Sequence, residues 1–290
     1  MKNLLLTIIF FFWKILSLLP RWFHNIFSTL LGRLLCSLSL ERNKFAKINI
    51  DLCFPELDKS QKNKLYKNNI MSSGSILLDT GVAWFWKDKR IKKQIKYKIL
   101  GLDLLNSFQL KSEPILLFFK HTHHLELDTR ILAMNSEIYG VERAHNSSKF
   151  EEIQSKGRLK SLQGIADRNN TISFIRWLKE GKTVLYAPDQ DYGAKKSEIV
   201  SFFNIPAATI SAPFKIINLT KCKPFFLDSF YKDDELILDI IKLDLDLSDR
   251  KKFLNQLNSI IEEKIRLNPG EYLWQHRRFK TTLGKKNIYK

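Results

Sequence analysis

The sequence predicts an α/β protein in which a mostly parallel central sheet is flanked by helices and preceded by an N-terminal membrane-anchoring helix. From about residue 95 onward, short apolar runs typical of buried strands alternate with segments of helical periodicity. Two strand-like runs, 224–231 and 235–243, follow each other directly and indicate one antiparallel pair. A nearly continuous apolar run from Leu4 to Leu19 is typical of a segment that enters a membrane.

The N-terminal apolar run is followed by a second helical pattern. As a helix, the run from Leu4 to Leu19 would extend about 24 Å, which is less than the roughly 30 Å of a bilayer's hydrocarbon core. Pairs of large apolar residues then repeat at helical spacing from Trp22 to Leu35, which predicts an amphipathic helix. We therefore expect residues 1–20 to form a single membrane anchor, either a transmembrane helix or a helix that lies in the membrane interface, and residues 21–290 to form the main domain.

The expected domain has three parts. Residues up to about 94 are helical, with Ser60 as an N-cap, and the α/β core spans about 95–273. Residues 274–290 form a basic tail, in which Arg277 and Arg278 are expected to be structural or to face the membrane. In the core, the patterns predict strands at 95–100, 115–119, 183–186, 224–231 and 235–243, and helices at 104–110, 172–180, 212–219 and 250–266.

The net charge of +18, from 48 basic and 30 acidic side chains, indicates an anionic partner. Residues 101–273 contain 24 basic and 24 acidic side chains, so the excess lies on the flanks. A nucleic-acid-binding protein would more often carry this charge on its recognition element, whereas basic flanks beside an apolar segment suit an anionic membrane surface. Only Lys2 precedes the apolar run and many basic residues follow it, which predicts that the main domain is cytoplasmic.

Three cysteines, Cys36, Cys53 and Cys222, form no C-x-x-C pair. They are too few for a disulfide framework or a structural zinc site. This cysteine usage fits a protein that faces the reducing cytoplasm.

Three of the six histidines lie in the tetrapeptide His121–His124, directly after the buried strand expected at 115–119. Glu126 and Asp128 follow within a few residues. In an α/β sheet, ligands bind beyond the carboxyl ends of the strands, where this segment should lie. A single histidine here could cap a helix or face solvent, but the whole cluster favours a catalytic or metal-binding role.

A zinc site is one interpretation of the cluster. The binuclear hydrolase pattern H-x-H-x-D-H is not met, because Leu125 stands in the position of the aspartate and Glu126 in that of the last histidine. The pattern H-E-x-x-H is absent, and the remaining possible ligands, His145 and His276, are distant in sequence. We expect no metal and no cofactor, and keep a metal-dependent membrane-surface hydrolase as an alternative.

A histidine–carboxylate pair is the other interpretation. His121 and Glu126 would lie about 140° apart on one helix, so they can meet only if His121 is on the preceding loop and Glu126 is in the first turn. In such a pair the carboxylate orients the imidazole, and the second ring nitrogen can accept a proton from a hydroxyl group. His123 and Asp128 have the same spacing, so spacing does not choose between the two pairs.

The segment from His121 to Ile131 resembles the H-x-x-x-x-[D/E] block of the glycerolipid-type acyltransferases. It is most similar to the late acyltransferases of lipid A biosynthesis, whose block reads H-x-x-x-L-E-L-x-x-R-I. Four further segments resemble the same family in the expected order, namely Asn49–Leu57, Lys156–Ser161, Tyr186–Gly193 and Trp274–Lys280. The resemblance covers about residues 42–280 and implies that His121 is the catalytic base and Glu126 its acidic partner.

The resemblance also implies residues that bind substrate. Arg158 is expected to contact a phosphate, since arginine suits bidentate phosphate recognition, and Asp189 to contact the acceptor. A turn around Asp189 remains an equally good interpretation, because its neighbours are turn-forming residues. Arg143 lies where the family often shows Tyr-Arg-Pro, but Glu142 and Ala144 replace its two neighbours.

The implied reaction is transfer of a fatty acyl chain from an acyl-carrier-protein thioester to a hydroxyl of a lipid A precursor, at the cytoplasmic side of the bacterial inner membrane. No covalent intermediate is implied, and the nucleophile motif G-x-S-x-G is absent. The partners would be the acidic carrier protein, the anionic lipid A precursor and inner-membrane lipid, with no nucleic acid. The alternatives are another glycolipid or phospholipid acceptor, and a non-enzymatic basic peripheral protein.

Overall fold

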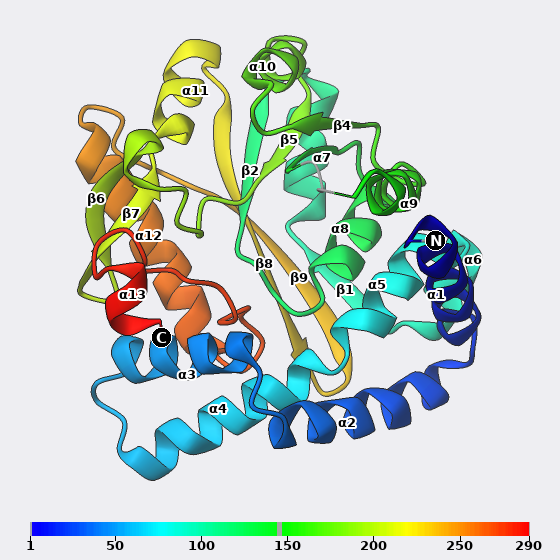
Figure 1. The fold of residues 1–290 in the computed structure, drawn as a ribbon. Coiled ribbons are helices and arrows are strands. Elements are labelled where there is room, and N and C mark those ends of the chain that lie inside the picture. The colour runs from blue at the N-terminus through cyan, green and yellow to red at the C-terminus, as the bar shows by residue number, and fades with distance from the viewer. Residues whose placement is uncertain (1, 144–146, 290) are drawn as a thin grey trace.

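A computed structural model of the chain describes residues 2–143 and 147–289. A seven-stranded sheet lies at the centre of the molecule, with helices on both of its faces (Figure 1). The strand order is β1-β9-β8-β2-β5-β3-β4, and every neighbouring pair is parallel except β8 with β9. This arrangement confirms the predicted α/β fold with a mostly parallel sheet and one antiparallel pair.

Several strands agree closely with their predicted bounds, and others were not predicted. The central sheet contains β1 (Tyr97–Leu100), β2 (Ile115–Phe119), β3 (Tyr139–Glu142), β4 (Gly164–Asp167), β5 (Thr183–Tyr186), β8 (Lys223–Lys232) and β9 (Glu235–Lys242). A separate antiparallel hairpin joins β6 (Ser197–Phe202) to β7 (Ile205–Ile210). The strands β3 and β4 lack an apolar run, because each has only four residues, of which one is glycine and one is acidic.

Six helices precede the sheet: α1 (Lys2–Ser17), α2 (Arg21–Ser37), α3 (Glu41–Cys53), α4 (Lys59–Ser73), α5 (Ile76–Phe85) and α6 (Asp88–Gln94). The N-cap of α4 is Asp58 rather than the predicted Ser60. The Asp58 carboxylate accepts a hydrogen bond from the Gln61 amide at 2.8 Å, and the Gln61 side chain accepts one from the Asp58 amide at 2.9 Å. This reciprocal capping box satisfies two amides that the helix itself leaves unpaired.

The helices of the core connect and cover the strands. They are α7 (Leu102–Leu110), α8 (Leu125–Ala133), α9 (Ser148–Arg158), α10 (Thr171–Lys179), α11 (Ala212–Thr220) and α12 (Arg250–Leu267), followed by the short α13 (Lys285–Ile288) and accompanied by the 3₁₀ turn η1 (Ala194–Lys196). The strand β2 is central and buried on both faces. Leu116 and Phe118 join one apolar layer, whereas Ile115 and Leu117 join the other. This explains its continuous apolar run and places its carboxyl end at the middle of the sheet.

The N-terminal segment differs from the transmembrane form of the predicted anchor. No helix in the described residues is both long enough and apolar enough to cross a membrane. Instead, α1 packs against α5, where the Trp13 indole N–H donates to the Leu77 carbonyl at 2.9 Å. The two helices approach each other closely at Gly81 of α5. A Cβ atom at this position would lie only 1.9 Å from the hydroxyl oxygen of Ser17 on α1.

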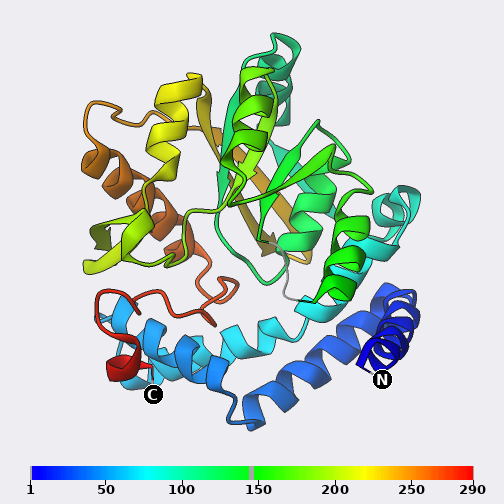
Figure 2. The ribbon, with the colours of Figure 1, turned by 45° about the horizontal axis from the view of Figure 1, so that its top comes forward.

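The helices α1 and α2 expose large apolar side chains. On α1 the exposed residues include Ile8, Phe11, Phe12 and Ile15, and on α2 they are Trp22, Ile26, Leu30 and Leu34. The four positions on α2 recur every fourth residue, so they share one face of the helix. Figure 2 shows α1 to α4, in blue to cyan, along one side of the molecule and away from α10 and α11. We call the exposed apolar residues of α1 and α2 the N-terminal apolar face.

The C-terminal tail packs into the domain. The Arg278 side chain is fully buried, and its guanidinium donates to the Ala208 carbonyl at 2.8 Å and to the Thr209 hydroxyl at 3.0 Å. Arg277 donates to Glu41 at 2.5 Å and lies over the Phe45 ring. Of the two roles expected for these arginines, the structure therefore favours the structural one.

Candidate active site

His121 lies on the short loop that leaves the carboxyl end of β2 and leads into α8. Glu126 is in the first turn of α8, as the spacing argument required. The loop is attached to the C-terminal part of the chain, because the His123 amide donates to the Glu271 carbonyl and the Leu273 amide donates to the His121 carbonyl, each at 3.0 Å. These backbone hydrogen bonds hold His121 in place at the carboxyl end of β2.

The carboxylate that binds the His121 ring is Asp189. Its Oδ1 lies 2.6 Å from His121 Nδ1, and its Oδ2 accepts the His121 amide at 2.9 Å. An ionised carboxylate can only accept, so Nδ1 carries a proton, and in the neutral imidazole it is Nε2 that has the lone pair. Burial opposes ionisation of Asp189, but its hydrogen bonds with His121 and its electrostatic interactions with His121 and His276 hold the pKa of Asp189 below its ordinary value. The buried carboxylate is therefore negatively charged, and the imidazole, 18% exposed, has a fixed tautomer.

Glu126 has different partners from those predicted. Its Oε2 accepts from the Trp84 indole at 2.7 Å, and both of its oxygens accept from the Arg158 guanidinium. The far side of that guanidinium binds Glu142. Burial works against the charge on Arg158, but the two carboxylates raise its pKa above the ordinary value. Arg158 is therefore a cation shared between two acids.

The predicted hydrogen bond between His121 and Glu126 is thus corrected. Within the described ranges the two side chains share no hydrogen bond, and Asp189 occupies the orienting position instead. The sequence placed Asp189 at the carboxyl end of a strand but could not show that this strand, β5, is the neighbour of β2. In the sequence, Trp84 belongs to the apolar run Trp84-Phe85-Trp86. No pattern in the sequence pointed to its contact with Glu126.

The competing pair, His123 with Asp128, is not formed either. His123 is buried with Ser72 3.0 Å from Nδ1, and burial lowers its pKa to about 3. Asp128 is bound to His124 Nδ1 at 2.7 Å and accepts a hydrogen bond from the Ser229 hydroxyl at 2.6 Å. Both residues belong to the buried framework that supports the loop.

His124 is a buried cation. Its Nδ1 contacts Asp128, and its Nε2 lies 3.2 Å from Glu271. Burial lowers the pKa of His124, but the two carboxylates outweigh this and raise it to about 10. The imidazolium therefore links Asp128, in the first turn of α8, to Glu271, in the segment that follows α12.

This arrangement predicts a pH-dependent contribution of His124 to stability. Because its pKa is raised by folding, the contribution is complete below the unfolded pKa of about 6.5 and is lost as the pH rises toward 10. His124→Gln should lower the free energy of unfolding by about 3–5 kcal/mol at pH 6, as expected when one partner of a buried pair is removed. Urea titrations should show that difference shrinking steadily toward pH 10. A difference that is constant with pH would contradict the assignment.

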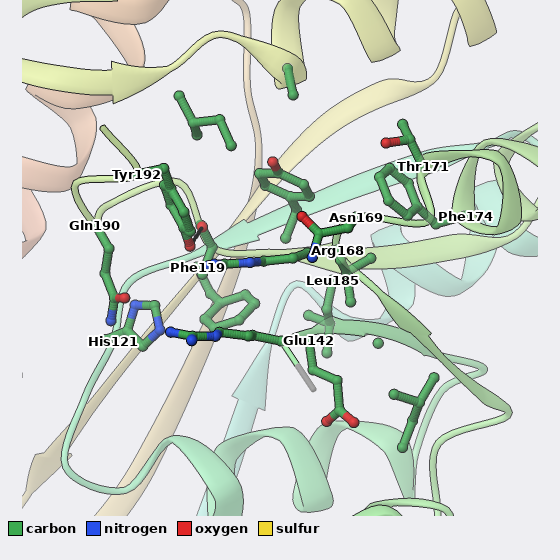
Figure 3. A pocket seen from close by; sticks show the side chains of 18 of the residues that line it. Phe119, His121, Glu142, Arg168, Asn169, Thr171, Phe174, Leu185, Gln190 and Tyr192 are labelled. Atoms are coloured by element: carbon green, nitrogen blue, oxygen red, sulfur yellow. Dashed lines mark hydrogen bonds between the residues drawn. The ribbon is translucent and has the colours of Figure 1, made fainter. Parts of the chain in front are cut away.

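A cavity of about 680 Å³ opens beside His121. His121, Glu126, Glu142 and Arg158 line it, together with apolar side chains such as Phe119 and those of Leu162, Ile165, Phe174 and Leu185. Figure 3 shows His121 and Glu142 along one side of the cavity and Arg168, Asn169 and Tyr192 along the other. The mixed lining can hold both a polar group and an alkyl chain.

The remaining predicted residues lie at or near this cavity. Arg143 lines it and is exposed, whereas Asp189 lies behind His121 and is wholly buried. Ala144 and His145 lie outside the described residues. Among the residues that the structure does describe, no group of three or more His, Cys, Asp or Glu side chains has an arrangement that could hold a metal ion.

Comparison with known proteins identifies the family of the chain. The sequence pattern of the family "Bacterial lipid A biosynthesis acyltransferase" matches residues 2–281. The chain is 32% identical to a lipid A biosynthesis palmitoleoyltransferase of Escherichia coli, over 86% of this chain and 82% of the relative. It is also 32% identical to the lauroyltransferase of the same pathway in E. coli, over 87% and 83% of the two chains. It is 22% identical to the E. coli myristoyltransferase, over 92% and 84%. The chain belongs to the bacterial lipid A biosynthesis acyltransferase family.

Proposed function

We propose that this enzyme transfers a fatty acyl chain from an acyl-carrier-protein thioester to a hydroxyl group of a lipid A precursor. The observation that carries the proposal is the 2.6 Å contact between His121 Nδ1 and Asp189 at the wall of the cavity. This contact leaves Nε2 as a base for a hydroxyl group. The names of the relatives supply the acceptor class, since they are transferases of lipid A biosynthesis.

In the proposed reaction, the two ring nitrogens of His121 have different roles. Nε2 of His121 takes the proton of the acceptor hydroxyl as its oxygen attacks the thioester carbonyl. The negative charge of Asp189 stabilises the imidazolium that forms. The carbon–sulfur bond then breaks, and the carrier's thiolate takes the proton from Nε2. The products are the new ester and the free thiol, and His121 returns to its starting state.

Glu126, which also lines the cavity, supports this chemistry. The cluster of Glu126, Arg158 and Glu142 carries two negative charges and one positive charge, so it adds a net negative potential beside His121. An imidazolium is favoured in such a field. Arg158 holds both carboxylates, which makes it a positioning residue for Glu126, and Arg143 is an exposed cation available to an anionic substrate.

The test is transfer of a labelled acyl chain by the purified protein in mixed micelles. Acyl carrier protein is the donor, and a lipid A precursor, another glycolipid and a phospholipid are compared as acceptors. Transfer to the lipid A precursor with a chelator present is the expected result. Release of free fatty acid that requires metal would instead support a metal-dependent hydrolase. Transfer to the phospholipid but not to the lipid A precursor would show that the proposed acceptor is wrong.

The enzyme is proposed to bind the cytoplasmic surface of the bacterial inner membrane through the N-terminal apolar face. Exposed aromatic and aliphatic side chains on one face of a helix insert into the boundary between headgroups and acyl chains. The basic residues that flank these helices add attraction to anionic lipid. A periplasmic location of a reporter fused after Lys290 would contradict this orientation.

We expect the double substitution Ile26→Glu/Leu30→Glu to abolish most binding to vesicles of anionic phospholipid, because it places two charges where the face enters the lipid. Co-sedimentation with the vesicles measures the effect. The matched control is Leu110→Glu/Leu219→Glu, which adds the same charges at exposed leucines outside the face and should leave binding intact. Higher ionic strength should weaken binding, since salt screens exposed charges beyond about 10 Å.

A further inference from the structure

The cavity contains more positive charge than its own acids can neutralise. Its lining includes six cations, which are Arg143, Arg158, Arg168, Lys195, Lys196 and Lys215, and two acids, Glu126 and Glu142. Both acids are bound by Arg158. Within residues 2–143 and 147–289, the other five cations form no ion pair. They are therefore available to an anionic ligand.

This excess is not a simple consequence of the charge of the chain. All six cations come from the stretch 101–273, which contains equal numbers of basic and acidic side chains. Five unpaired cations of this stretch line the cavity, whereas the acids of the stretch contribute Glu126 and Glu142, which are both bound by Arg158. Like charges repel, so such a cluster is favourable only when an anion or solvent compensates for it.

Four of the unpaired cations come from segments that carry none of the acid–base groups. Arg168 follows β4, Lys195 and Lys196 belong to η1, and Lys215 is in the first turn of α11. The Arg168 guanidinium lies 4.8 Å from the centre of the Tyr192 ring. Figure 3 shows Arg168 and Tyr192 across the cavity from His121. We call Arg168, Lys195, Lys196 and Lys215 the cationic wall.

Two helices also begin at this wall. Thr171 at the start of α10 and Ala212 at the start of α11 both line the cavity. The first turn of a helix presents amide N–H groups and a partial positive charge, which favour a bound anion. A planar guanidinium, several ammonium groups and two helix starts together suit the several oxygens and the charge of a phosphate better than a single carboxylate.

We propose that the cationic wall binds a phosphate group of one of the two substrates. This inference rests on the proposed function and extends it, because it assigns a binding subsite to residues separate from the His121 side. The phosphate has two possible sources: a phosphate of the acceptor's glucosamine sugars, or the phosphodiester that joins the acyl-bearing arm to its carrier protein. In either case, fixing the phosphate at one wall orients the reacting group toward His121 at the other.

The test compares two double variants that remove the same charge. Arg168→Gln/Lys215→Gln removes two cations from the wall. Arg176→Gln/Lys179→Gln removes two exposed cations on α10 that do not line the cavity, and it serves as the matched control. The first measurement is the stabilisation of each protein against thermal unfolding by inorganic phosphate, which does not depend on activity. The second is the KM for the lipid A precursor and the KM for the acyl carrier protein, measured separately.

In the wall variant, the phosphate concentration for half-maximal stabilisation should rise about tenfold or more. One KM should rise by a similar factor with little change in kcat, while the control should match the wild type. A higher KM for the lipid assigns the wall to the acceptor's phosphate, and a higher KM for the carrier assigns it to the donor's.

Three results would overturn the inference. Unchanged phosphate stabilisation and unchanged KM values would show that the wall binds no phosphate. Lost stabilisation with both KM values unchanged would show a site for free phosphate only. Equal effects in the control variant would show a general charge effect. If the wild type transfers no acyl chain at all, the proposed function fails, but the thermal measurement still decides whether the wall binds phosphate.

Discussion

His121→Ala should reduce acyl transfer by about 10²–10⁴-fold, because a positioned general base typically contributes that much. The reduction should appear in kcat, since the imidazole acts on the hydroxyl after both substrates have bound. The ring is only partly buried, so the variant should fold and bind vesicles as the wild type does. Rates of transfer from labelled acyl carrier protein, with chelator present, provide the measurement.

The matched control for this substitution is His123→Ala. His123 is buried with Ser72 and Gln275 as its partners, and it does not line the cavity. Its replacement should affect stability more than turnover in the protein that remains folded. Full activity in His121→Ala together with loss in folded His123→Ala would show that the wrong histidine has been assigned.

Asp189→Asn should reduce kcat by about 10²–10⁴-fold, a loss of the order expected when the charged partner of a catalytic histidine becomes neutral. Asparagine has nearly the same shape, but it cannot stabilise the imidazolium and it can hold the ring in the other tautomer. Glu126→Gln should reduce transfer by only about 10–100-fold, which corresponds to losing one charged hydrogen bond of about 1.5–3 kcal/mol. Arg158 would still be neutralised by Glu142.

The ratio of the kcat values of Asp189→Asn and Glu126→Gln distinguishes the roles of the two acids. If Asp189 orients His121, Asp189→Asn is the more severe, with an unchanged KM for both substrates. A larger loss in Glu126→Gln than in Asp189→Asn would return the orienting role to Glu126, as the five-residue spacing alone had suggested. Circular dichroism and urea unfolding of both variants would confirm that neither effect arises from a loss of folded protein.

Much of the fold could be predicted because its signals are local. The buried strands 115–119 and 183–186 are continuous apolar runs, and the structure places β2 and β5 at the same residues. The hairpin of β8 and β9 and the helices α10, α11 and α12 also lie close to their predicted bounds. The strands β3 and β4 were missed, because four-residue segments with a glycine and an acidic residue carry no apolar period.

The N-terminal segment shows a different limit of the sequence pattern. Its apolar run was correctly predicted to be helical, but hydropathy does not indicate whether a helix faces lipid or protein. In the structure, one side of α1 packs on α5 through Trp13 and Ser17, and the other side is exposed. The division into a buried and an exposed side depends on a partner more than 60 residues away in the chain.

From the sequence alone we could predict the fold class, the loop that carries His121 and the position of Glu126 in the first turn of α8. These features depend on apolar runs and on spacing within a few residues. Which carboxylate binds His121 depends on the tertiary structure, because Asp189 is 68 residues away and reaches His121 through the pairing of β2 with β5. The tertiary structure also joins Arg158 to both Glu126 and Glu142. The physical reason is that a charged side chain selects its partner by distance in the folded molecule, and residue spacing does not encode which strands become neighbours.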